Sequence, residues 1–173
     1  MNAYPALVIS LSLALLLAVS AMHQLRAAGQ WPQMIANYRL LPASLVRPVA
    51  LSLPLIELAC ALALLVPRTC PAGALATALL LASFALAMHV NIRRGRTALD
   101  CGCAGARPGQ GIAGWMVARN LLLAGLALLL LAAAPRRTLS MLEVVAAVGT
   151  VATLALLYPV AGTAWAPLRQ GRS

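Results

Sequence analysis

The chain has 173 residues, of which 62% are hydrophobic and 9% are charged. About a quarter of the residues in a soluble globular domain are charged, so this composition excludes an ordinary soluble domain and predicts a protein embedded in a lipid bilayer. The 13 basic residues are all arginine and outnumber three acids, but nearly all of them fall between apolar runs, so we expect no nucleic-acid binding.

The first predicted membrane span runs from Ala3 to Met22. This uncharged segment of 20 residues is long enough to cross a hydrocarbon core of about 30 Å. Residues 23–48 carry arginines, prolines and two aromatic residues, which indicates a segment at the membrane interface. Trp31 and Tyr38 suit the headgroup boundary, and apolar residues at helical spacing predict a short helix on the surface.

The second span, Val49 to Val66, contains the acidic residue Glu57. A carboxylate at membrane depth is costly and normally faces the interior of a bundle with a partner. We interpret Glu57 either as a proton acceptor for nearby chemistry or as a buried structural group. The basic residue inside a predicted span is Arg119, and we predict an ion pair or a water-bridged contact between it and Glu57.

The third span, Ala72 to Val90, ends at the polar interface with His89. Histidine titrates near neutral pH, so His89 is a candidate proton relay and equally a candidate interface residue. A fourth span runs from Ile112 to Ala134, and a fifth from Val144 to Ala166. We therefore expect an all-α integral membrane helical bundle of about five helices with a four-helix core.

The chemistry is expected in a short loop between the third and fourth spans, where Cys101 and Cys103 flank a glycine. That glycine allows a tight bend that brings the two sulfurs within disulfide range, and the resulting ring is strained. Strained, exposed disulfides are the labile ones, so we interpret the two cysteines as a redox pair. Cys60 is interpreted as a packing residue, and Cys70 is expected on the opposite side of the membrane.

Several motifs occur in a recognisable order. They are Asn-Tyr-Arg-Leu-Leu-Pro at 37–42, Leu-Pro-Leu-Ile-Glu-Leu at 53–58, Gly-Arg at 95–96, Asp-Cys-Gly-Cys-Ala-Gly at 100–105 and Arg-Asn-Leu at 119–121. In these motifs, which extend over roughly residues 3–134, the chain resembles the methylamine utilisation protein MauE family of DoxX-like multipass membrane proteins. The resemblance divides the chain into a MauE-like membrane domain, 1–138, and an additional C-terminal helix with a short basic tail, 139–173.

The resemblance implies a cell (inner) membrane protein that assists maturation of the methylamine dehydrogenase small (beta) subunit beside a thioredoxin-like, MauD-like partner. Our hypothesis is that Cys101 and Cys103 exchange disulfides with a partner through a mixed disulfide. No cofactor is certain. If the pair is reoxidised within the membrane, a quinone is the natural acceptor, with Glu57 or His89 handling protons. The alternatives are a non-catalytic assembly scaffold and a CxC protein that binds or passes a soft metal.

The distribution of arginine conflicts with this role. With five spans, the side that holds residues 23–48, the Cys-Gly-Cys loop and the C-terminus carries nine arginines, and the other side carries three. The positive-inside rule predicts that this loop faces the cytoplasm. The implied client is periplasmic, so the sequence leaves the side of the loop open.

Overall fold

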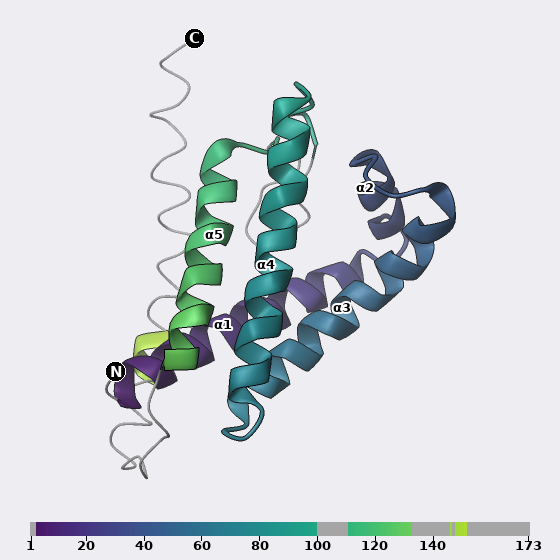
Figure 1. Cartoon of the computed structure of the whole chain (residues 1–173). Helices are drawn as coiled ribbons and strands as arrows, with labels where there is room; N and C mark the ends of the chain where they lie inside the picture. Colours follow the sequence, from purple (N-terminus) through teal and green to yellow (C-terminus); the bar gives the residue numbers. More distant parts are fainter. Residues whose placement is uncertain (1–2, 100–110, 133–145, 147, 152–173) are drawn as a thin grey trace.

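The computed structural model describes residues 3–99, 111–132, 146 and 148–151. In this part of the chain the protein is an all-α bundle (Figure 1). Its elements are α1 (Ala3–Arg26), α2 (Trp31–Asn37), α3 (Ala43–Leu65), α4 (Cys70–Arg93), α5 (Gly114–Leu129) and the 3-10 turn η1 (Leu130–Ala132).

Four of the described helices, α1, α3, α4 and the α5–η1 unit, are long and apolar enough to cross a membrane. Their outward faces are rich in leucine, and on α3 Leu55 and Leu62 are 61% and 65% exposed. Such faces suit lipid, because exposure of large apolar patches to water is unfavourable. The prediction of an all-α membrane bundle is confirmed.

The predicted fifth span, Val144 to Ala166, falls mostly outside the described residues. Within it, residues 146 and 148–151 are helical. The hydroxyl oxygen of Thr150 lies 3.1 Å from the hydroxyl oxygen of Tyr4 in α1. This contact brings residue 150 to the first turn of α1.

Two helices extend further than predicted. The first span was expected to end at Met22, but α1 continues to Arg26, because Gln24 finds a hydrogen-bond partner inside the bundle. Likewise α3 begins at Ala43 rather than at Val49, directly after Pro42, whose backbone is extended. Part of the predicted interfacial segment therefore belongs to the two helices that flank it.

The turn between α3 and α4 brings these helices into close contact. The Thr69 hydroxyl donates a hydrogen bond to the Ala63 carbonyl oxygen over 3.0 Å. At Gly73 an added Cβ would lie 2.8 Å from the Cβ of Ala63, closer than two non-bonded carbon atoms normally approach. Small residues at such a crossing are typical of membrane helices, whose association depends on close backbone packing.

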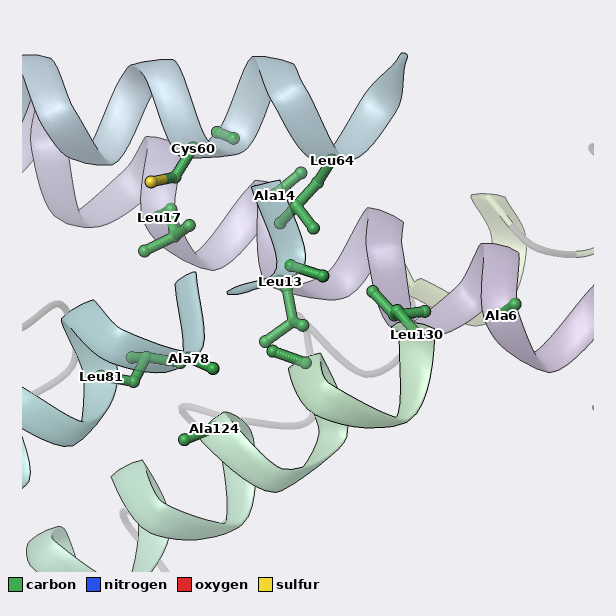
Figure 2. Close-up of a cluster of buried hydrophobic side chains, with 13 residues drawn as sticks. Ala6, Leu13, Ala14, Leu17, Cys60, Leu64, Ala78, Leu81, Ala124 and Leu130 are labelled. Atoms are coloured by element: carbon green, nitrogen blue, oxygen red, sulfur yellow. The ribbon is translucent and has the colours of Figure 1, made fainter. Parts of the chain in front are cut away.

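The core combines alanines with a few leucines from all four long helices. Figure 2 shows Leu13 and Leu17 of α1 facing side chains of α3, α4 and α5. In this arrangement α1 packs mainly on α3, whereas α4 lies between α3 and α5. The chain is thus folded as successive antiparallel neighbours, as Figure 1 shows for α4 and α5.

This topology places α2 and the segment that follows α4 at one end of the bundle, and the α3–α4 turn at the other. Cys70 starts α4, a helix of 24 residues and therefore about 36 Å long. Cys70 is consequently remote from the end of the bundle at which residues 94–99 and 111–113 lie, as expected.

Candidate functional site

The two ends of the Cys-Gly-Cys loop meet at a single point of the bundle. The backbone N–H of Ile112 donates a hydrogen bond to the Leu99 carbonyl oxygen over 3.0 Å. Gly111 lies so close to Thr97 that an added Cβ would collide with its carbonyl oxygen. We call residues 97–99 with 111–112 the loop stem. Cys101 and Cys103 themselves lie outside the described residues.

A small apolar cluster of α4 and α5 side chains packs against the loop stem. Ile112 is buried with Met88 of α4 and Met116 of α5, and Leu99 packs against the same group. Methionine adapts to irregular gaps, so this cluster can accommodate the non-helical stem between two helix ends. Both segments of the loop stem are thereby fixed to the bundle through side chains as well as through the backbone.

Arg96 joins the stem to the end of α2. Its guanidinium donates to the carbonyl oxygens of Asn37 and Tyr38, over 2.8 and 3.4 Å. These carbonyls lie at the C-terminus of α2, where backbone oxygens lack helical partners and a cation is favoured. A third bond of 3.3 Å reaches the side-chain oxygen of Asn91, which is fully buried in α4. Arg96 thus connects two of the motifs that were far apart in sequence.

Glu57 occupies the centre of a second polar group, between α1 and α3. Its side chain is 0% exposed, and its Oε1 accepts a hydrogen bond of 2.8 Å from the Gln24 side-chain amide. The same amide nitrogen lies 3.2 Å from the Ser20 hydroxyl oxygen. Oε2 of Glu57 is buried and has no hydrogen-bond partner in the part of the chain that the structure describes.

The described hydrogen-bond partner of Glu57 is Gln24, and the predicted ion pair or water-bridged contact with Arg119 stays a prediction. In the packing order, α3 lies against α1 and α4, whereas α5, which carries Arg119, packs mainly on α4. Arg119 lies over the ring of Trp115, with 5.9 Å between its Cζ and the ring centroid. This distance is within the range of a cation–π contact.

His89 is exposed on the outer face of α4, four residues before that helix ends. Glu57, in contrast, is enclosed between α1 and α3. The structure therefore does not bring the two candidate proton carriers into one site.

Sequence reasoning missed Gln24 and the bonding role of Arg96. Both look like ordinary interface residues at the ends of spans, and their buried partners become visible only when the helix ends are placed. It also missed a cavity lined by Gln24, Trp31 and Tyr38. Trp31, expected at the headgroup boundary, is instead 9% exposed and lines this cavity.

Comparison with known proteins identifies the family. A family model described as methylamine utilisation protein MauE matches residues 2–133, more than half of the chain. The chain belongs to the MauE family. The membership that the motifs indicated is confirmed, and the loop stem, Arg96, Glu57 and Arg119 all lie inside the matched region.

Individual members of the MauE family share substantial identity with the chain. The methylamine utilization protein MauE of Methylophilus methylotrophus is 40% identical over 155 residues, which cover 88% of this chain and 81% of that protein. MauE of Paracoccus denitrificans is 44% identical over 117 residues, which cover 67% of this chain and 62% of that protein. No solved structure matches the chain.

Proposed function

We propose that the protein is a membrane thiol–disulfide redox protein that assists maturation of a partner protein in methylamine utilisation. Cys101 and Cys103 are the proposed exchanging pair. The place in methylamine utilisation follows from the relatives, which are named methylamine utilization proteins. The proposed location is the cell (inner) membrane.

The observation that carries the proposal is the loop stem. A pair of thiols that must meet a second protein needs a loop held at the edge of the membrane, with both ends fixed. The Ile112–Leu99 hydrogen bond and the Arg96 contacts with α2 provide such a base. The neighbouring Arg93 and Arg94 are exposed, as residues at a water interface are.

The proposed reaction is thiol–disulfide exchange. One thiolate of a reduced partner attacks the Cys101–Cys103 disulfide, which forms a mixed disulfide and releases one thiolate of the pair. The second thiolate of the partner then attacks the mixed disulfide. The partner leaves with a new disulfide, and the pair leaves as two thiols, having gained two electrons.

Two further residues have proposed roles in proton handling. His89 is exposed near the end of α4 that leads to the stem, and it is the proposed proton relay between water and the released thiolates. Glu57 is the proposed proton acceptor inside the bundle. Its Oε1 accepts a hydrogen bond from Gln24, and its Oε2, which has no partner among the described residues, is the proposed site of the proton.

The proposed partners are a thioredoxin-like, MauD-like protein and a disulfide-containing client, by resemblance the methylamine dehydrogenase small (beta) subunit. The two-cysteine loop would engage a thiol or a disulfide on each of them. The lipid bilayer is the solvent of the four described spans.

The proposal is tested by replacing the thiols in cells that mature the client. Cys101→Ser and Cys103→Ser should each abolish client maturation while membrane insertion stays normal. Cys70→Ser, at the far end of α4, is the matched control and should mature the client at the wild-type level. One single variant should also accumulate a mixed disulfide with the partner, seen as a band that disappears on reduction.

Full maturation in the Cys101→Ser/Cys103→Ser double variant would refute the redox role and favour a scaffold. Stoichiometric metal in the purified protein, lost in the same double variant, would favour a metal-binding role instead.

A further inference from the structure

The bundle contains a cavity of about 300 Å³, beside the end that carries the loop stem. Its walls come from α1, α2, α3 and α4 and from the segment that follows α2. Aromatic side chains make up part of the lining, including Trp31, Tyr38 and Phe84. Leu40 and Leu41 line it as well and are themselves exposed, so the cavity borders the outside of the bundle.

Two buried polar atoms of the lining residues have no hydrogen-bond partner among the described residues. Trp31 Nε1 can only donate a hydrogen bond, and the side-chain oxygen of Gln24 can only accept one. Both side chains are more than nine-tenths buried. Buried polar groups in proteins are nearly always satisfied, so a polar ligand in the cavity has one unpartnered donor and one unpartnered acceptor available among the lining residues.

The described lining holds no charged side chain. An ionic ligand, including a phospholipid headgroup, would therefore enter without a counter-charge, which is unfavourable in an apolar site. The ligand should be neutral, largely apolar and flat enough to lie among aromatic rings. It should carry an oxygen that accepts from Trp31 and, in one of its states, a hydroxyl that donates to Gln24.

We propose that this cavity binds the ring of a membrane quinone, with the isoprenoid tail leaving past Leu40 and Leu41 into the lipid. A quinone offers carbonyl oxygens to the Trp31 N–H. The corresponding quinol offers hydroxyl groups to the Gln24 oxygen. The volume lies at the lower end of ligand-pocket sizes and suits a ring with the first part of a tail.

The cavity is connected to both polar groups described above. Met88 and Phe84 line it and also belong to the apolar cluster that supports the loop stem. Gln24 lines it and binds Glu57 through its amide nitrogen. A ring in the cavity would therefore lie one layer of side chains from the stem and one hydrogen bond from a carboxyl group.

This inference deepens the proposed function and rests on it for its redox consequence. The Cys101–Cys103 dithiol would transfer two electrons to the quinone, and two protons would accompany them. The S–S bond forms, the dithiol is oxidised to the disulfide, and the quinone is reduced to the quinol. The disulfide is then ready for the next partner.

Binding can be measured with the full-length protein in nanodiscs, with decylubiquinone as the probe. The chain has three tryptophans, so Trp115→Phe/Trp165→Phe leaves Trp31 as the single fluorophore. Decylubiquinone should quench its emission saturably. The reciprocal variant, Trp31→Phe/Trp165→Phe, retains Trp115 outside the cavity and should show only the linear quenching of a probe dissolved in lipid.

Filling the cavity should prevent binding. Ala87→Phe is introduced into the Trp115→Phe/Trp165→Phe background, in which Trp31 is the single tryptophan. It should weaken the affinity measured by saturable quenching at least tenfold. Leu86→Phe is the matched control on the outer face of α4 and should change it less than twofold. Gln24→Leu should weaken quinol binding more than quinone binding, and it serves as the second variant if Ala87→Phe does not fold.

Cys101→Ser/Cys103→Ser should bind decylubiquinone normally, so loss of the redox function and loss of the binding site are separate results. Absence of saturable quenching, or equal quenching in Ala87→Phe and Leu86→Phe, would overturn the proposal. Displacement of the probe by a short-chain phosphatidylglycerol would assign the cavity to a phospholipid and would also overturn it.

Discussion

Removal of the Arg96 side chain should release the loop stem from α2. The guanidinium makes three hydrogen bonds, but only the one to the Asn37 carbonyl, at 2.8 Å, is short; the other two are 3.3 and 3.4 Å. A hydrogen bond to a charged group contributes about 1.5–3 kcal/mol. Because Arg96 is only partly buried, we expect Arg96→Ala to weaken docking of the stem by about 2–3 kcal/mol.

This loss corresponds to roughly a 30- to 150-fold increase in the open population of the stem, at about 1.4 kcal/mol per factor of ten. Hydrogen exchange at the Ile112 amide measures it directly, since that amide is bonded to the Leu99 carbonyl. Hydrogen exchange in Arg96→Lys should be intermediate, because the lysine ammonium lacks the planar fork of the guanidinium and cannot reach several acceptors at once. Arg94→Ala, an exposed neighbour, is the control, and equal protection in Arg96→Ala and Arg94→Ala would refute the reasoning.

Substitutions at three further positions test the helix packing, the loop stem and the buried carboxyl group. Gly73→Ala should lower the free energy of unfolding by about 1–3 kcal/mol, because its Cβ overpacks the helix crossing, whereas Gly125→Ala, with open space around it, should not; a thermal melt of both variants measures this. Gly111→Ala should raise hydrogen exchange across the loop stem and slow client maturation, and unchanged exchange would contradict the proposed contact. Glu57→Gln should remain as stable as wild type within about 1 kcal/mol, because Gln24 keeps a carbonyl acceptor. Glu57→Leu leaves that amide without an acceptor and should be less stable by about 1–3 kcal/mol; equal melting of the two Glu57 variants would contradict the hydrogen bond.

The helical spans could be predicted from the sequence because long uncharged runs have one stable structure in lipid, the helix. Their ends were harder to place. Trp31 and Gln24 resemble residues of a headgroup boundary, yet both are buried. Polar residues near the end of a span can turn inward when a neighbouring helix offers a cavity or a partner, and the sequence does not state which helix that is.

The same limitation explains why Gln24 was not foreseen as a partner of Glu57. Charge complementarity favoured Arg119, the basic residue at membrane depth, but contact depends on which helices are neighbours. With α3 packed on α1, Glu57 accepts a hydrogen bond from an amide of α1. The motif at 37–42 and the Gly-Arg pair at 95–96 were visible in the sequence; the hydrogen bonds from Arg96 that join them required the fold.

The redox state of the cysteine pair in cells tests the central claim most directly. In a Cys60→Ala/Cys70→Ala background, acid quenching followed by a thiol reagent that adds mass reports Cys101 and Cys103 alone. We predict a mixture of dithiol and disulfide, with the dithiol accumulating when membrane quinone is depleted. An impermeant reagent applied to intact cells would show which side the loop faces. A pair that stays fully reduced with or without quinone would contradict the proposed redox cycle.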